Sequence, residues 1–334
     1  MFRSGTLVFC LHNLDCSGAN QVILNLVEGK VVKGHILCIA PKEGPLTSRL
    51  LRCGASVRIG SIYSILESVR DVSMVVCNSI LTADIVVGLR NFGIPVLWIL
   101  HEWWDDKMIT ENLELRGVDS FTIATVNEAM CSASHVVCVC EGQKELYKPI
   151  APCSVIFAGT PAPCTPLKTE LNTLDCQNSN TTIATPIVIL VLGIVCPRKN
   201  QVYAVQLFKE LSKQLDQITE SNRFSTELRN MGFNTSISAN DLKLRIVGVR
   251  YTRQYEMDYV DELYNAIEGD ERISLHEVTE NVGVHYRESD MLLFPSKNEV
   301  TPLVIMEASK IYIDKYVYIF DFNNCYECVY NYYY

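Results

Sequence analysis

Short apolar runs rich in Val, Ile and Leu alternate along this chain with longer amphipathic stretches, and this alternation constrains the fold more than any other feature. In the first half, the runs that have the length of a buried strand are Leu7–Leu11, Ile36–Ala40, Ser56–Ile59, Met74–Asn78, Val96–His101 and His135–Val139. The stretches expected to be helices are Asn20–Glu28, Leu46–Arg52, Ala83–Asn91 and Asn127–Ala133. Strand–helix alternation of this kind predicts a parallel sheet with helices on both faces, and such sheets bind ligands at the carboxyl ends of their strands.

The same alternation resumes in the second half, after a segment rich in Pro, Thr, Asn and Ser. The expected strands there are Ile187–Leu192, Leu244–Val247, Ile273–His276 and Met291–Phe294. The expected helices are Gln201–Leu215, Tyr255–Ile267, Val282–Glu288 and Pro302–Ser309, and Ser221–Asn240 is a polar insertion. The chain is therefore predicted to be an α/β protein of two Rossmann-like, doubly wound domains in tandem. The predicted boundaries are 1–157 for the first domain, 158–186 for a linker or insertion, 187–310 for the second domain and 311–334 for a Tyr-rich tail.

Length and composition agree with two soluble domains and exclude some partners. The chain has 334 residues, of which 48% are hydrophobic and 20% charged, and domains average about 150 residues. The net charge of −9 argues against nucleic acid as a partner, since proteins that bind phosphate backbones carry basic clusters. The longest apolar run, Pro186–Cys196, is far shorter than the about 20 residues that span a bilayer. We therefore expect no transmembrane segment and a cytoplasmic location, with peripheral association at a membrane surface left open.

The cysteines do not indicate a metal or disulfide framework. There are 14 of them in a long chain without a recognisable signal peptide, so reduced thiols are expected. Cys325 and Cys328 form a lone Cys-x-x-Cys without a second pair nearby, and no metal site is predicted.

The most specific motif is the segment Pro295–Ala308, in which a buried strand is followed by a polar loop and a helix. Thr301 is expected to cap that helix, with Pro302 as its first residue. A helix N-terminus presents free amides and the positive end of the helix dipole, which suits a phosphate. Glu299 in the loop and Glu307 in the second turn would flank that site. Such carboxylates can accept hydrogen bonds from sugar and ribose hydroxyls on either side of a diphosphate.

This Glu-x7-Glu block, preceded by Pro-Ser and followed by Ala, resembles the retaining glycosyltransferases of family 4, which have the two-domain GT-B fold. Three other segments agree with the family in order and spacing. They are Ser17–Asn20 after the first strand, Val191–Gly193 with Pro197–Gln201, and Leu244–Gly248. The resemblance covers roughly residues 5–310. It implies an enzyme that transfers a sugar from a UDP- or GDP-sugar, with retention and without a metal or other cofactor, onto an acceptor that is a glycan, a lipid or a small molecule.

Residue by residue, the resemblance implies a set of site residues. Lys199, together with Arg198, would neutralise the donor diphosphate, Glu307 would hold the ribose hydroxyls and Glu299 would contact the donor sugar. Gly18 would let backbone amides approach a phosphate, and His101 matches the histidine that the family places beside the transferred sugar. The catalytic candidates are thus His101 and Glu299, and the donor-binding candidates are Gly18, Arg198, Lys199, Glu299 and Glu307. The absence of any Asp-x-Asp agrees with a donor site without metal.

The chain departs from the family in several places. Ile194 stands where the family often has Arg, and Ser17–Gly18 replaces the usual Gly-Gly. The residues after Glu307 do not resemble the family's further strands and closing helix, so the second domain is expected to be truncated. Tyr312, Tyr316 and Tyr318 of the tail, with Ile311, Ile313 and Ile319, would form one edge strand. A catalytically impaired remnant that still binds a nucleotide-sugar is therefore the alternative function, whereas the Glu-x7-Glu block counts against an epimerase or a phosphorylase on the same fold.

Some of these residues can also be explained without a role in catalysis or binding. Glu299 and Glu307 can be ordinary exposed acids, and His101 can simply pack against Trp103. Lys199 fits a surface role poorly, because a cation at a helix start opposes the helix dipole.

Overall fold

The structure is a computed structural model that describes residues 5–30, 34–157, 159, 186–220, 238–311 and 316–319. The chain divides into two compact units. The first comprises residues 1–161 with the short segment 299–303, and the second comprises 162–298 and 304–334.

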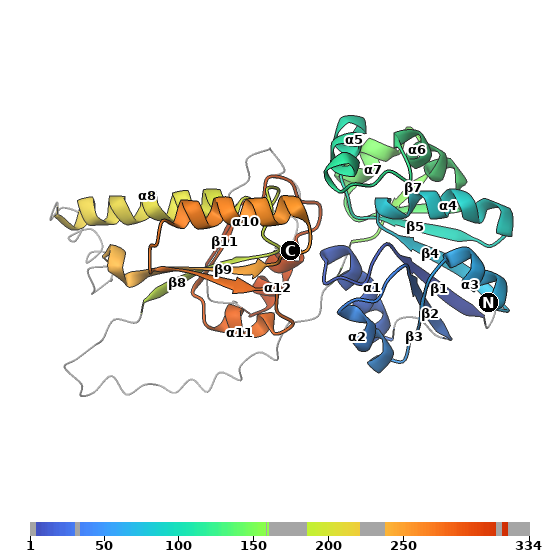
Figure 1. The fold of residues 1–334 in the computed structure, drawn as a ribbon, viewed down its shortest axis with the longest axis horizontal. Coiled ribbons are helices and arrows are strands. Elements are labelled where there is room, and N and C mark those ends of the chain that lie inside the picture. The colour runs from blue at the N-terminus through green and yellow to red at the C-terminus, as the bar shows by residue number, and fades with distance from the viewer. Residues whose placement is uncertain are drawn as a thin grey trace. The chain divides into compact units, whose positions relative to one another are not determined.

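The first unit is built on a parallel sheet of seven strands. They are β1 (Thr6–Leu11), β2 (Ile36–Ala40), β3 (Ser56–Ile59), β4 (Val72–Asn78), β5 (Val96–Leu100), β6 (His135–Cys138) and β7 (Cys153–Val155). Their order across the sheet is β3-β2-β1-β4-β5-β6-β7, and every pair of neighbours is parallel. Its helices are α1 (Gly18–Glu28), α2 (Leu46–Arg52), α3 (Ile62–Ser68), α4 (Ala83–Leu89), α5 (Asp106–Leu115), α6 (Ile123–Ser132) and α7 (Glu141–Tyr147), with short 3-10 turns η1 (Ile80–Thr82) and η2 (Arg90–Phe92). Figure 1 shows these elements in blue to green.

The second unit repeats this plan with five parallel strands. They are β8 (Ile187–Leu192), β9 (Leu242–Val249), β10 (Ile273–Glu277), β11 (Met291–Phe294) and β12 (Tyr316–Ile319), in the order β10-β9-β8-β11-β12. The helices are α8 (Gln201–Glu220), α10 (Gln254–Ile267), α11 (Val282–Arg287) and α12 (Leu303–Ile311), with a 3-10 turn η3 (Ala239–Asp241). In Figure 1, α8 and α10 run side by side over one face of this sheet, and α11 and α12 lie on the other.

Alternate residues of each central strand of the second unit enter different cores. Ile189 and Val191 of β8 pack with Phe208 of α8 and with residues of α10. Leu190, between them, packs in a second cluster with Tyr286 of α11 and residues of α12. This period of two explains why the strands are continuous apolar runs, since both faces of a parallel sheet are covered.

The predicted α/β fold with two Rossmann-like sheets is confirmed. The sequence missed α3, α5, α7 and β7, which are short or polar elements. The expected edge strand is confirmed over Tyr316–Ile319 as β12, which pairs with β11 in parallel register from Met291↔Tyr316 to Phe294↔Ile319, whereas Ile311 ends α12. Most of the predicted linker 158–186, the insertion up to residue 237, and Cys325 and Cys328 lie outside the described residues.

One local prediction was wrong. The helix that was expected to start at Pro302 starts one residue later, at Leu303. Proline is compatible with either position, because it has no backbone N–H to leave unpaired. Glu307 still falls in the second turn.

The strand orders also locate the ligand sites expected of such sheets. In both units the chain starts in the middle of the sheet, builds outward to one side, and then returns to build the other side. The reversal lies between β1 and β4 in the first unit and between β8 and β11 in the second. In open parallel sheets, ligands bind at the carboxyl ends of the two strands that flank such a reversal.

Candidate active site

The loop that follows β8 brings two cations to the carboxyl edge of the second sheet. The Lys199 ammonium lies 5.3 Å from the ring centroid of Phe294, the last residue of the neighbouring strand β11. Arg198 is exposed, and its Nη1 donates to the carbonyl oxygen of Asn298 at 2.7 Å. The amide of Lys297 donates in turn to the carbonyl oxygen of Arg198 at 2.9 Å. The loops after β8 and β11 are thus joined directly at the reversal point.

Two glycines allow the loop after β8 to take this path. Gly193 directly follows β8 and has a φ of 146°. Gly248 lies within β9 and has a φ of 128°. A Cβ on Gly248 would overlap the carbonyl oxygen of Gly193, and a Cβ on Gly193 would lie 3.5 Å from Cε of Lys199. The amide of Val195 donates to the carbonyl oxygen of Gly248 at 3.0 Å. Close approach of the two backbones therefore holds the start of the loop that carries Lys199.

Glu299 and Glu307 follow β11, the other strand of the reversal, in the chain. Glu299 follows Asn298 in the loop after β11, and Glu307 lies on α12; both side chains are half-buried. The Tyr286 hydroxyl lies 2.9 Å from Oε2 of Glu307 and 3.1 Å from the carbonyl oxygen of Val304. Tyr286 is fully buried, so it fixes the Glu307 side chain from the core side.

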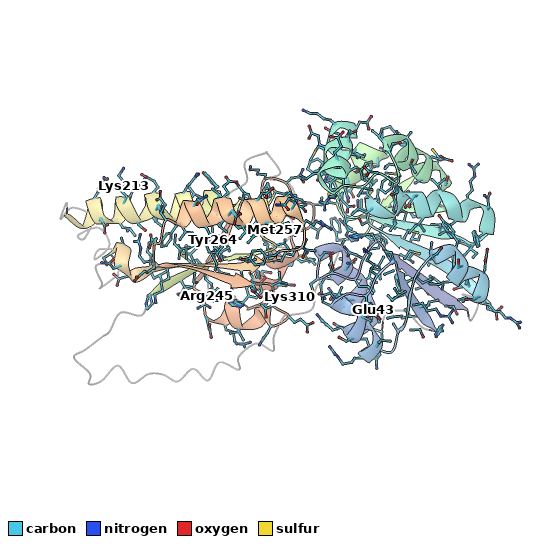
Figure 2. All side chains as sticks on the ribbon, viewed as in Figure 1. Glu43, Lys213, Arg245, Met257, Tyr264 and Lys310 are labelled. Carbon is cyan, nitrogen blue, oxygen red and sulfur yellow. The ribbon has the colours of Figure 1, made fainter. Side chains whose placement is uncertain are left out.

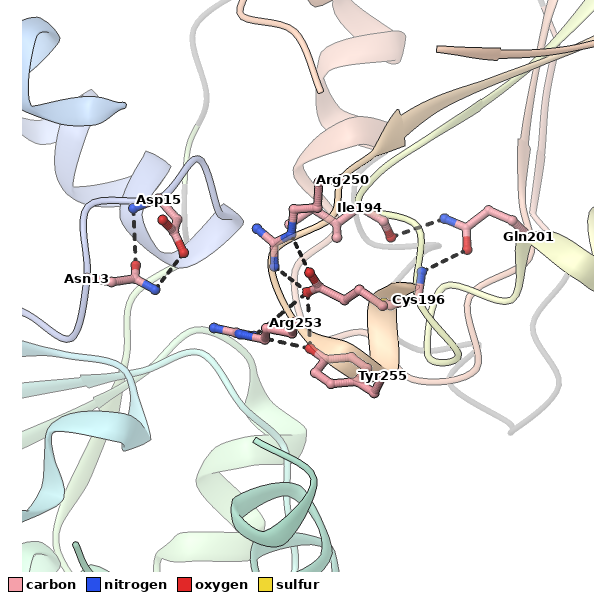
Figure 3. Close-up of polar contacts among 9 residues, drawn as sticks. Asn13, Asp15, Ile194, Cys196, Gln201, Arg250, Arg253 and Tyr255 are labelled. Atoms are coloured by element: carbon pink, nitrogen blue, oxygen red, sulfur yellow. Dashed lines mark hydrogen bonds and ion pairs between the residues drawn. The ribbon is translucent and has the colours of Figure 1, made fainter. Parts of the chain in front are cut away.

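A cluster of charged side chains follows β9 at the same edge (Figure 3). Glu256, in the first turn of α10, is 1% exposed and accepts from Nε of Arg250 at 2.8 Å and from the Tyr255 hydroxyl at 3.2 Å. Arg253 donates to the Tyr255 hydroxyl at 3.1 Å. Two guanidinium groups surround one carboxylate, so the cluster adds net positive charge to this edge of the sheet.

In the first unit, His101 follows β5 and lies in a polar network at the carboxyl edge. Its Nε2 is 2.8 Å from Oδ1 of Asn78, the last residue of β4, and the Asn78 amide nitrogen is 3.3 Å from Oδ1 of Asn20 on α1. Asn78 and Asn20 are 0% and 1% exposed. Burial lowers the pKa of His101, against the opposing effect of Glu102, so the imidazole is neutral at pH 7.

The main chain around His101 is held by its neighbour. Both oxygens of Glu102 accept hydrogen bonds, Oε1 from the Ser79 hydroxyl at 2.6 Å and Oε2 from the amides of Ile80 at 2.9 Å and His101 at 3.1 Å. The side chain of Gln143 donates to the carbonyl oxygen of Glu102 at 2.8 Å. The position of His101 is therefore determined on both its side-chain and its main-chain atoms.

Gly18 is the first residue of α1 and is exposed, and a Cβ there would meet no atom within 4 Å. Ser17 caps the helix, accepting from the amide of Asn20 at 3.3 Å. The amides of Gly18 and Ala19 open the first turn of an eleven-residue helix beside the reversal between β1 and β4.

The predicted residues thus form two groups, one at the carboxyl edge of each sheet. Arg198, Lys199 and Glu307 belong to the second unit, and Gly18 and His101 to the edge of the first sheet. Glu299 directly follows Asn298 in the chain and is grouped with the first unit. Sequence reasoning missed Asn78, Asn20 and Tyr286. The signal for Asn78 was available, since it is a polar residue that ends an apolar strand, as His101 does.

Two classes of feature are lacking in the described residues. No group of three or more His, Cys, Asp or Glu side chains in this part of the chain could hold a metal ion. Of the helices in the described ranges, none has both the length and the apolar character needed to cross a bilayer.

Residues 177–313 match the family described as glycosyl transferases group 1. No curated protein sequence matches the chain significantly.

Solved structures are similar over most of the chain. The Anabaena protein HepE, solved with UDP and glucose, is 15% identical with a TM-score of 0.66, over 91% of this chain and 78% of its own. Sucrose-phosphate synthase from Thermosynechococcus elongatus is 13% identical with a TM-score of 0.58, over 91% and 78%. A glycosyltransferase from Rickettsia africae is 17% identical with a TM-score of 0.53, over 95% and 79%. Residues 177–313 are therefore similar to the group 1 glycosyltransferases, and the chain has the two-domain GT-B fold of these solved structures.

Proposed function

We propose that this protein transfers a hexosyl group from a UDP- or GDP-sugar to an acceptor hydroxyl, with retention of anomeric configuration and without a metal ion. The observation that carries the proposal is the pair of contacts at the reversal between β8 and β11, within the matched residues 177–313: Arg198 donates to the carbonyl oxygen of Asn298, and Lys199 lies over the ring of Phe294. The structure of HepE with UDP and glucose favours UDP as the nucleotide, since the two proteins share a fold.

The diphosphate is the leaving group, and the chain offers positive charge where it would lie. Negative charge on the diphosphate grows as the glycosidic bond breaks, so a fixed cation stabilises the transition state more than the bound donor. Lys199 is held over the Phe294 ring rather than extended into solvent, which keeps its ammonium at the edge of the sheet. The first-turn amides of α12 add donors to the same anion.

The two carboxylates provide hydrogen-bond acceptors for the donor's hydroxyl groups. Glu307 is assigned to the ribose, because its Oε2 is already oriented by Tyr286. Glu299 is assigned to the donor sugar and counts with His101 as a catalytic candidate. Each hydrogen bond from a hydroxyl to a carboxylate contributes about 1.5–3 kcal/mol, so the loss of one lowers affinity by roughly 10- to 150-fold.

The experiment is a panel of UDP-, GDP- and ADP-sugars assayed for donor hydrolysis and for transfer, with and without EDTA. We expect turnover with a UDP- or GDP-hexose that survives EDTA, and a product whose anomeric configuration, measured by NMR, equals that of the donor. Lys199→Ala should lower kcat about 100- to 1000-fold. Glu307→Gln should weaken donor binding. Lys213→Ala, an exposed lysine on α8 labelled in Figure 2, is the matched control and should change neither.

A strict requirement for Mn²⁺ or Mg²⁺, or a product of inverted configuration, would contradict the proposal. Donor binding without turnover in every condition would instead assign the chain to nucleotide-sugar binding alone. Hydrogen exchange locates the nucleotide independently of turnover: protection should rise in the loops after β8 and β11.

A further inference from the structure

Asn20, Asn78 and His101 form a hydrogen-bond network in the first unit. The donor and acceptor of each of its hydrogen bonds can be deduced from the main-chain carbonyls that Asn20 contacts. The side-chain nitrogen of Asn20 lies 3.1 Å from the main-chain oxygen of Asn13 and 3.0 Å from that of Asp15. Main-chain carbonyls only accept hydrogen bonds. The Asn20 amide therefore has one possible orientation, in which its nitrogen faces these carbonyls and its Oδ1 faces Asn78.

This orientation determines the next two members. Because Oδ1 of Asn20 is an acceptor, the Asn78 atom that lies 3.3 Å away must be its donating nitrogen. The Asn78 oxygen is then the atom that lies 2.8 Å from Nε2 of His101. An oxygen without a hydrogen can only accept, so Nε2 of His101 must carry the proton.

The other end of the network agrees with the same direction. Oδ1 of Asn13 accepts from the main-chain amide of Asp15 at 3.2 Å, and the Asn13 nitrogen donates to Oδ2 of Asp15 at 2.9 Å. Both Asn13 and Asp15 lie in the loop after β1, and Figure 3 shows their mutual contacts. Every amide between His101 and Asp15 thus has a single orientation.

We propose that Asn78 is a positioning residue that holds His101 in its Nε2-protonated form, so that Nδ1 is the hydrogen-bond acceptor offered to a sugar hydroxyl. The inference rests on the proposed function, in which His101 is a catalytic candidate. A neutral imidazole has one donor and one acceptor nitrogen. With Nε2 committed to a fully buried amide, Nδ1 carries the lone pair. The lowered pKa of His101 keeps the ring neutral, so this lone pair is retained at pH 7.

The first test is the tautomer itself, which needs no substrate. In the full-length protein labelled with ¹⁵N-histidine, the His101 signals are assigned by their loss in His101→Gln. We expect Nε2 to be protonated and Nδ1 not. Asn78→Leu should give a mixture of both tautomers, whereas Asn112→Asp, a polar change on α5 outside the network, should leave His101 unaltered. A wild-type ring protonated on Nδ1 would overturn the proposal.

The second test is kinetic. Asn78→Asp keeps the shape and the accepting oxygen but places a negative charge beside the ring, which favours the imidazolium. Its pH–rate profile should shift so that activity is lost on acidification at a higher pH than in the wild type. Asn78→Leu should lower kcat about 10- to 100-fold with little change in the donor's KM, since misorientation of a reacting group costs rate rather than donor affinity.

The outcomes separate this inference from the proposed function. If no donor is turned over by the wild type, the proposed function fails, while the ¹⁵N experiment still decides the tautomer. If turnover is normal and Asn78→Leu, folded as judged by circular dichroism, has wild-type kcat and pH profile, the positioning role is refuted. A shifted pH profile in Asn78→Asp but not in Asn112→Asp supports it, because a merely structural defect would not move the profile.

Discussion

At the scale of single residues, main-chain groups determine the tautomer of His101 and the position of Lys199. The tautomer of His101 follows from two carbonyl oxygens in the loop after β1, and the position of Lys199 follows from the contact between Gly193 and Gly248. A carbonyl oxygen can only accept hydrogen bonds, and the contact between Gly193 and Gly248 leaves no space for a Cβ. Both features therefore restrict the local geometry more than a surface ion pair does.

The glycine contact gives a prediction on stability. Gly248→Ala should destabilise the protein by about 1–3 kcal/mol, because the new Cβ meets the Gly193 carbonyl and φ of 128° is strained for alanine. Gly18→Ala is the matched control: there the Cβ meets nothing and the residue is helical, so stability should be unchanged or rise by about 0.5–1 kcal/mol. Urea unfolding of both variants checks this. Equal effects at the two positions would show that the backbone contact is not tight.

At the scale of elements, several helices are anchored by a buried polar group. α1 is anchored by Asn20, α11 and α12 by the hydrogen bond from Tyr286 to Glu307, and α10 by Glu256. Buried polar groups of this kind are stabilising only when they are paired, so each of these hydrogen bonds restricts where its helix can pack.

The anchor of α10 gives a second prediction. Glu256→Gln removes the charge that Arg250 and Arg253 face in a largely buried site, with the Arg250 side chain only 15% exposed. Breaking a buried pair by removing one partner costs about 3–5 kcal/mol. Glu111→Gln, which removes an exposed i,i+4 partner of Lys107 on α5, should cost less than about 0.5 kcal/mol. Chemical denaturation measures both; comparable losses would mean that the pair after β9 is solvated.

At the scale of the whole molecule, both units contain partly buried histidines whose pKa is lowered, and stability should depend on pH for that reason. His276 on β10 and His285 on α11 have ring centroids 5.2 Å apart. Burial lowers the pKa of both; the nearby Arg245 (Figure 2), and for His285 also His276, lower it further, while Glu288 opposes these effects. His101 in the first unit has a lowered pKa for the reason given above.

A histidine whose folded pKa lies below its unfolded value of about 6.5 binds its proton more readily in the unfolded chain. The free energy of unfolding should therefore fall as the pH drops through about 6.5, and level off once the pH is below the folded pKa. Urea unfolding between pH 7.5 and 5 measures this slope. It should be shallower in the double variant His276→Gln/His285→Gln; a slope identical to that of the wild type would rule out these two rings as its source.

Local patterning was sufficient for most of the architecture. Runs such as Ile187–Leu192 and Met291–Phe294 are apolar because both faces of the sheet are covered, and this signal is present in the run itself. The Pro-Ser and Glu-x7-Glu spacing likewise predicted the strand, loop and helix that carry Glu299 and Glu307. The polar helix α5 was missed, since it buries only Ile109 and Leu113.

The sequence by itself determined that this protein is a pair of parallel α/β units with a donor-type motif in the second, because periodicity and loop chemistry are local properties. Only the tertiary structure decided which loops meet. His101 and Asn78 are 23 residues apart, and Asn78 and Asn20 are 58 apart; they come together because β1, β4 and β5 are neighbours in the sheet. Strand order is set by packing over the whole unit, so the orientation of His101, which depends on that order, arises only when the sheet has formed.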